Sequence, residues 1–179
     1  VNPHVRLIVL AANGSSFCAG ADLNWMKRMA TFNYDQNIVD GKALANMLHT
    51  ISICPKPIIC KVQGPAYGGG VGLISVCDIA IASENAQFVF SEVKLGITPA
   101  TISPYVIAAI GERQSHRYFL TAEMFDAWTA LELGLVHQVV ELKELDNVVD
   151  RLVKQMMNNS PAAMLAAKEL ICNISKRPI

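Results

Sequence analysis

Charge is scarce in this sequence and evenly balanced. Of the 179 residues, 17% are charged, and 15 basic residues stand against 15 acidic ones, which makes the formal net charge zero. A chain without excess positive charge lacks the electrostatic footprint of a nucleic-acid binder or of a protein that adsorbs to an anionic membrane. We therefore expect neither partner. Because an isolated domain normally carries more solvating charge, the scarcity also predicts a surface partly buried against other subunits.

Common site motifs are missing as well. The five cysteines are irregularly spaced and contain no C-x-x-C pair, which argues against a disulfide framework or a zinc site. The patterns G-x-S-x-G, H-E-x-x-H and G-x-x-x-x-G-K-[ST] do not occur, and the glycines after Tyr67 do not fit G-x-G-x-x-G. The four histidines stand singly, so each is expected to be structural or on the surface. We expect no metal and no bound cofactor.

Hydrophobic residues, by contrast, make up 52% of the chain, which suits one compact domain with a sizeable core. The expected strands are 5–12, 56–63, 78–82 and 86–90, after which the sheet is expected to end, and a late strand at 136–140. The first expected helix follows the small residues that open the stretch 17–29, and the second is capped by Asp35 and runs to Ile53. The others are expected at 69–76, 102–110, 112–120, 127–133 (capped by Asp126, closed by Gly134), 142–157 and, after Ser160, 161–174. This order predicts an α/β fold.

Two turns of small residues, at 19–22 (A-G-A-D) and 68–70 (G-G-G), each follow a buried strand and open a helix. The second belongs to the stretch V-Q-G-P-A-Y-G-G-G-V-G-L at 62–73, where five glycines fall within nine residues. Helix N-termini after tight turns expose N–H groups and a partial positive charge, which can hold an oxygen that gains negative charge. Two such turns facing each other would form an oxyanion hole. The alternative is that these glycines only allow close packing of helix on strand.

Glu92 has unusual neighbours for a charged residue: Phe88, Val89, Phe90 and Val93. A carboxylate desolvated among them would have a raised pKa, in the range useful for proton transfer. The alternative is an exposed or capping glutamate. Combined with an oxyanion hole, Glu92 could move a proton at a carbon next to a thioester whose enolate is stabilised.

Over essentially its whole length the chain resembles the crotonase family, the enoyl-CoA hydratases and isomerases. The segments that carry the resemblance are F-C-A-G-A-D-L at 17–23, Q-G-P-A-Y-G-G-G-V-G-L at 63–73, C-D-I-A-I-A at 77–82, S-E-V-K-L-G-I at 91–97 and L-E-L-G-L-V at 131–136. The resemblance implies a crotonase-like spiral of β-β-α units over 1–100, without the N-terminal part of the family's domain. It further implies a helical trimerisation region over 101–179, without the C-terminal tail, and assembly as a homotrimer or hexamer.

The resemblance also implies roles for individual residues. The N–H groups of Ala21 and Gly69 would form the oxyanion hole, and Glu92 would be the catalytic acid/base. An acyl-CoA thioester would be the substrate, so that coenzyme A is part of the substrate and not a cofactor. The residues implied to contact it are Ala19, Ala21, Asp22, Leu23, Asn24, Gly68 and Gly69.

One position departs from the family's pattern. Typical hydratases carry two glutamates, and here the second is Glu92 but the first position is Gly72. The amino-acid sequences of segments 68–73 and 91–106 resemble those of bacterial hydratases that act on branched acyl-CoA, such as methylglutaconyl-CoA and carboxygeranoyl-CoA. This likeness favours hydration of a branched 2-enoyl-CoA, as in leucine degradation or fatty acid metabolism. Two alternatives stay open: Δ3-Δ2 isomerisation by Glu92 alone, and a catalytically degenerate module that binds RNA or protein.

The sequence begins at Val1 without a methionine and runs directly into its first strand, which indicates an internal part of a longer protein. The resemblance favours a bacterial cytoplasmic location, with the mitochondrial matrix as the alternative.

Overall fold

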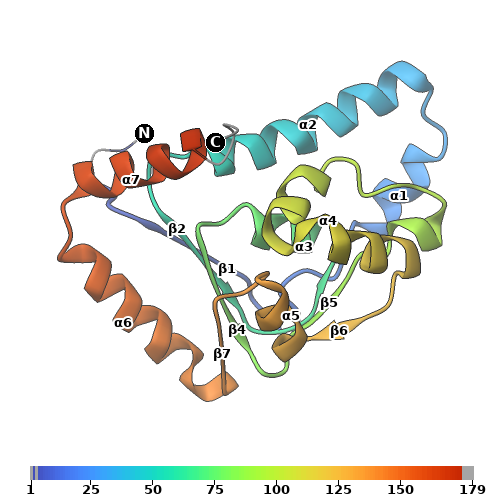
Figure 1. Ribbon diagram of the computed structural model, residues 1–179. Coiled ribbons are helices and arrows are strands. Elements are labelled where there is room, and N and C mark those ends of the chain that lie inside the picture. The colour runs from blue at the N-terminus through green and yellow to red at the C-terminus, as the bar shows by residue number, and fades with distance from the viewer. Residues whose placement is uncertain (1, 3, 175–179) are drawn as a thin grey trace.

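The computed structural model describes residues 2 and 4–174 of the chain (Figure 1). Its strands are β1 (Ile8–Ala11), β2 (Ile58–Val62), β3 (Ala66–Tyr67), β4 (Ile79–Ser83), β5 (Gln87–Val89), β6 (Phe125–Asp126) and β7 (Gln138–Val140). Its α-helices are α1 (Leu23–Met29), α2 (Tyr34–Ser52), α3 (Gly69–Ser75), α4 (Ser103–Thr121), α5 (Ala127–Leu133), α6 (Leu145–Met157) and α7 (Pro161–Ile174). Two short 3-10 helices are η1 (Glu92–Leu95) and η2 (Leu142–Glu144).

The strands form two sheets, a parallel one in the order β1-β2-β4-β7 and a smaller one in the order β3-β5-β6. In the parallel sheet Ile59 pairs with Val9 on one side and with Ile79 on the other. The expectation that the sheet ends after β5 is wrong, because β7 joins the edge of β4 with Ile81 opposite Gln138. This pairing joins segments more than fifty residues apart, which local sequence patterns do not encode.

The central strand β2 is buried on both faces, and its side chains alternate between two hydrophobic clusters. Cys60 and Val62 belong to the larger cluster, together with residues of α3 and α4. Ile59 points to the other face, where it packs with Ile81 and with Val149 of α6. Figure 1 accordingly shows α6 along one side of the parallel sheet and α3, α4 and α5 on the other side. The sheet thus holds α3, the glycine-rich helix, inside the core.

Several helix ends lie where capping residues, glycine and proline in the sequence predicted them. The helix α5 begins after Asp126, whose carboxylate accepts a hydrogen bond from the N–H of Thr129, and it ends at the left-handed Gly134, as predicted. The helix α7 begins at Pro161 as predicted. The cap of α2 is Asn33 and not Asp35, because Asn33 and Gln36 form a reciprocal capping box. The helices expected at 102–110 and 112–120 form one element, α4, broken at Gly111 by a non-helical φ of 77°.

The outer helices carry apolar side chains that the described residues leave exposed. Along α2, Leu48 is the residue that the structure buries. Large exposed hydrophobic residues on or beside α2 and α7 are Tyr34, Ile38, Val39, Met47, Ile53, Leu170, Ile171 and Ile174. Figure 1 shows α2 and α7 together at one border of the molecule. Within residues 2 and 4–174, no helix has both the length and the hydrophobicity needed to span a membrane.

Candidate active site

The two small-residue turns lie side by side because the segments before them are hydrogen-bonded in parallel. The N–H groups of Phe17 and Cys18 donate to the carbonyl of Pro65 at 2.9 and 3.1 Å, and Tyr67 N–H donates to the Cys18 carbonyl at 3.0 Å. Cys18 and Ala66 form an isolated parallel bridge. Parallel strands end at the same edge, so the turns that follow Cys18 and Tyr67 emerge together.

The first turn is exposed and leads into α1. Gly20 has a φ of 97°, and a Cβ placed there would lie 3.8 Å from Cβ of Tyr67. The carboxylate of Asp22 caps α1 by accepting the N–H of Trp25 at 2.8 Å. Among the residues predicted to contact substrate, Ala19, Ala21, Asp22 and Asn24 are exposed, whereas Leu23 is described only by its backbone at the start of α1.

The second turn is built on Gly68, which precedes α3 with φ 50° and ψ −116°, a conformation that side chains rarely adopt. Its N–H donates to the Val89 carbonyl at 2.9 Å, and its own carbonyl accepts from Val71 at 2.9 Å. No side chain caps this end of α3 within the described part of the chain. The turn therefore presents the start of α3 without a competing side-chain acceptor.

The glycines of α3, which are Gly69, Gly70 and Gly72, have different surroundings. A Cβ at Gly70 would overlap the side chain of Cys18, with Sγ only 2.9 Å away. A Cβ at Gly72 would overlap Ile102, whose own Cβ would lie at 2.8 Å. At Gly69, no described atom outside its immediate neighbours lies within 4 Å of that point. Among the glycines of α3, Gly69 is thus the one with open space beside its α-carbon.

Glu92 reaches this turn from η1. A Cβ at Gly68 would lie 3.0 Å from Oε1 of Glu92 and 3.7 Å from Oε2. Oε2 is buried, and none of the groups within residues 2 and 4–174 donates a hydrogen bond to it. Burial raises the pKa of Glu92 above its ordinary value, and a hydrogen bond from its own backbone offsets part of the rise. The structure therefore places a partly desolvated carboxylate against the residue that precedes Gly69.

Ile102 belongs to this region, although it was not among the residues predicted for the site. It precedes α4, and 1% of its surface is exposed. Its only signal in the sequence was an apolar residue in the run T-P-A-T-I-S-P at 98–104, which by itself is compatible with any buried helix start.

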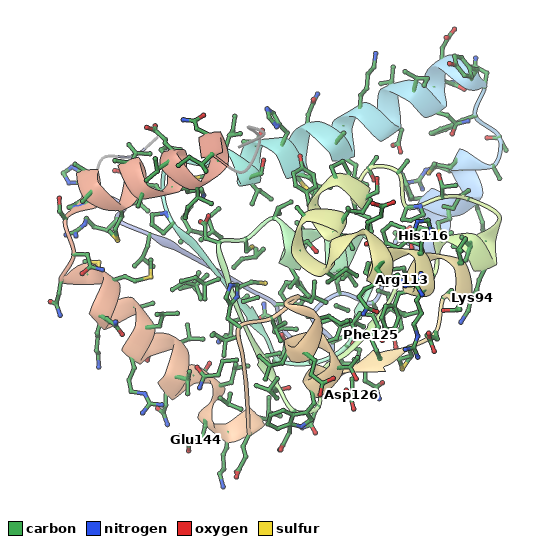
Figure 2. The ribbon with its side chains drawn as sticks, in the orientation of Figure 1. Lys94, Arg113, His116, Phe125, Asp126 and Glu144 are labelled. Carbon is green, nitrogen blue, oxygen red and sulfur yellow. The ribbon has the colours of Figure 1, made fainter. Side chains whose placement is uncertain are left out.

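Two open surface hollows lie away from the glycine turn. The first, of about 350 Å³, is lined by Phe125, Asp126 and the ion pair of Arg117 with Glu123. The second, of about 390 Å³, lies along α4 and is lined by Arg113, His116 and Arg117, the last of which it shares with the first hollow. Figure 2 shows Arg113 and His116 on α4, on the same side of the molecule as Lys94 of η1. Neither hollow is lined by Glu92, so neither is taken as the site.

Fold and site together define an α/β protein with two adjacent small-residue turns, the second of which lies against a partly desolvated carboxylate. Comparison of the sequence with protein families and known proteins supports this class. The family described as enoyl-CoA hydratase/isomerase matches residues 1–177. The short-chain-enoyl-CoA hydratase of Clostridium acetobutylicum is 34% identical over 172 residues, covering 93% of this chain and 63% of that protein.

Two further relatives extend the comparison. The peroxisomal Delta(3,5)-Delta(2,4)-dienoyl-CoA isomerase of Arabidopsis thaliana is 33% identical over 181 residues, covering 95% of this chain and 65% of that protein. The crystal structure of an enoyl-CoA hydratase from Shewanella pealeana superposes with a TM-score of 0.96 at 45% identity, covering 99% of this chain and 66% of that one. The chain belongs to the enoyl-CoA hydratase/isomerase family, the crotonases.

The chain spans only part of the length of these relatives. It covers 67%, 54% and 63% of three curated members of the family.

Proposed function

We propose that the protein catalyses proton transfer on an enoyl-CoA thioester through a stabilised enolate. The N–H groups of Ala21 and Gly69 bind the thioester carbonyl oxygen, and Glu92 is the acid/base. The observation that carries this proposal is that Oε1 of Glu92 lies 3.0 Å from the point a Cβ at Gly68 would occupy, one residue before the proposed donor. A group with a raised pKa in this place can both accept and return a proton near neutral pH.

Hydration of a 2-enoyl-CoA is the first candidate reaction, and a branched acyl chain of the methylglutaconyl-CoA type is the proposed substrate class. In this reaction Glu92 takes a proton from water as the water oxygen bonds to C3 and the C2–C3 double bond becomes the enolate. The protonated Glu92 then delivers that proton to C2, which regenerates the thioester carbonyl. The names of relatives such as the Clostridium hydratase support this candidate.

Isomerisation of a 3-enoyl-CoA to a 2-enoyl-CoA is the second candidate. Here Glu92 takes a proton from C2, and the electron pair enters the carbonyl to form a dienolate. Glu92 then returns the proton to C4 as the double bond moves into conjugation with the carbonyl. The specific observation in favour concerns Gly72, the position of the family's other glutamate. The space that a side chain at Gly72 would need is filled by the side chain of Ile102. Glu92 alone completes this proton balance without water.

The residues of the first turn are proposed to hold the coenzyme A part of the substrate. Asp22, Asn24 and Ala21 are exposed where the first turn enters α1, which makes them accessible to a ligand. Because the carboxylate of Asp22 already caps α1, its proposed role is to fix the turn through which Ala21 presents its N–H.

A spectroscopic assay distinguishes the two reactions. Hydration of a 2-enoyl-CoA removes the absorbance of the conjugated thioester, whereas isomerisation of a 3-enoyl-CoA creates it. Glu92→Gln is expected to lower either rate by about 10²–10⁴-fold and to leave acyl-CoA binding intact. The matched control is Glu132→Gln on the exposed side of α5, which should keep full activity. Full activity in Glu92→Gln would refute the proposed role.

Assembly as a homotrimer or hexamer is proposed from the exposed apolar residues of α2 and α7. A surface that carries Val39 at 69% and Ile171 at 68% exposure is costly to leave in water. Light scattering of the purified protein tests this part, and a monomeric mass would contradict it.

A further inference from the structure

Gly72 and Ile102 are packed as a pair in the core. Gly72 is buried on α3, and a Cβ at that residue would overlap Cγ2 of Ile102 and lie 2.8 Å from its Cβ. Ile102 is 1% exposed and is the residue from which α4 starts. The space toward which a side chain at residue 72 would point is therefore filled by one branched apolar side chain.

This pair lies one turn of α3 away from the residue that the proposed acid/base contacts. Gly68 and Gly72 are one turn apart, with the N–H of Gly72 donating to the Gly68 carbonyl at 3.3 Å. Glu92 thus lies against Gly68, directly before α3, and Ile102 lies against Gly72, one turn further along the helix.

We propose that Ile102 is a specificity-determining residue, whose side chain takes the space of a second carboxylate and so limits the active site to Glu92. This inference rests on the proposed function of Glu92 as the acid/base. The position that a Cβ at residue 72 would take is occupied by the side chain of Ile102, the residue directly before α4.

The chemical consequence is a division of labour different from that of a site with two carboxylates. A second carboxylate would hold and polarise the attacking water while the first delivers the proton. Neither glycine at residue 72 nor the apolar side chain of Ile102 can supply that water with a hydrogen-bond acceptor, so water activation depends on Glu92 alone. Proton transfer between two carbons of the substrate needs no such water, and Ile102 therefore favours isomerisation relative to hydration.

Exchanging the sizes of the two residues tests the inference. The variants are Gly72→Glu, Ile102→Gly and their combination, each made in the full chain. Ile102→Ala is less suitable, because its remaining Cβ would still lie 2.8 Å from a Cβ at residue 72. Glycine is compatible with residue 102, which precedes the first residue of α4, where glycine is well tolerated.

The first readout is thermal unfolding. Gly72→Glu alone should lower the Tm by about 5 °C or more or fail to fold, because it overpacks the core. The double variant should be more stable than the sum of the two single effects predicts, as expected for residues in contact. Additive effects, or a Gly72→Glu variant as stable as the parent, would overturn the steric part of the proposal.

The second readout is the ratio of hydration to isomerisation, measured on matched 2-enoyl-CoA and 3-enoyl-CoA substrates. The double variant should raise this ratio by about tenfold or more over Ile102→Gly alone, since general acid/base groups contribute at least that much. The matched control is Gly72→Gln with Ile102→Gly, which has the same size but no carboxylate and should leave the ratio unchanged.

The outcomes separate this inference from the proposed function. A folded double variant with an unchanged ratio, in a parent that Glu92→Gln inactivates, would overturn the specificity role of Ile102 and leave the role of Glu92 standing. A parent that acts on neither substrate would instead refute the proposed function, and the stability coupling between residues 72 and 102 would still be measurable.

Discussion

Oε1 of Glu92 lies 3.0 Å from the point that a Cβ on Gly68 would occupy. The carboxylate thus rests directly on the backbone of the glycine turn, and the φ of 50° at Gly68 excludes most side chains for a second, independent reason. The position of the acid/base and the shape of the turn are consequently determined together.

Gly68→Ala is expected to disturb both the shape of the glycine turn and the position of Glu92. The added methyl group strains a backbone conformation, at a cost of about 1–3 kcal/mol, and displaces Glu92, which should lower kcat/KM by about 10²-fold. Gly14→Ala is the matched control, because Gly14 also has a positive φ of 85° but no described atom within 4 Å of the added carbon. Urea unfolding and steady-state kinetics measure the two effects. Equal loss of activity in both variants would contradict the link between Gly68 and Glu92.

Gly69→Pro tests the proposed oxyanion donor. Gly69 is the first residue of α3, a position where proline is tolerated, and the space beside its α-carbon is open. Proline there removes the N–H group, so kcat should fall by about 10²–10³-fold while the protein stays folded. Gly69→Ala retains the N–H and should lose much less. Circular dichroism confirms the fold, and similar kcat values for both variants would show that this N–H does not act on the substrate.

Glu92→Gln should be more stable than the parent at neutral pH, although it is inactive. Because burial raises the pKa of Glu92, the folded state binds the proton more tightly than the unfolded state does. This carboxyl therefore favours folding below its ordinary pKa of 4.5 and loses that contribution as the pH rises through the raised value. At pH 7 the variant should unfold about 1–3 °C higher, and the gain should disappear near pH 4. A lower Tm at pH 7 would speak against a desolvated Glu92.

The same raised pKa predicts the pH dependence of activity. Only the ionised form of Glu92 can accept a proton, so the acid limb of kcat/KM should lie above the ordinary glutamate range. Activity is therefore expected to fall on acidification earlier than it would for an exposed glutamate. An acid limb at or below pH 4.5 would contradict this assignment.

Asp126→Ala should destabilise the fold without touching the site. The carboxylate of Asp126 accepts the N–H of Thr129 at 2.8 Å at the start of α5, and this bond lowers the pKa of Asp126. Losing such a cap costs about 1 kcal/mol. The lowered pKa means that the contribution is present above the ordinary pKa and is lost as the pH falls through the lowered value, so the two proteins should converge in stability at acid pH. Asp126→Asn preserves the cap and should stay close to the parent.

The sequence predicted those features that are encoded within a few residues. Asp126 and Gly134 bound α5 because a capping side chain and a left-handed glycine act locally. The resemblance implied that Glu92 acts together with the glycine turn. The structure shows the contact, with Oε1 of Glu92 lying 3.0 Å from the point a Cβ at Gly68 would occupy. Local patterns could not show that β7 joins β4, or that β3 and β6 exist as two-residue strands, because these depend on pairing between distant segments.

Ile102 illustrates the same limit within the site. Thirty residues separate it from Gly72, and its apolar character is equally compatible with any position in the core. Only the packing of α4 on α3 shows which glycine it faces.

The overlap between residue 72 and Ile102 also orders the mutations by which such a site can change over generations. A glutamate that arises first at residue 72 meets a filled core and is removed by selection for folding. A glycine that arises first at 102 removes this overlap, so that the glutamate can later be introduced. We therefore expect sign epistasis between the two positions, in which the order glycine at 102 and then glutamate at 72 is favoured over the reverse order.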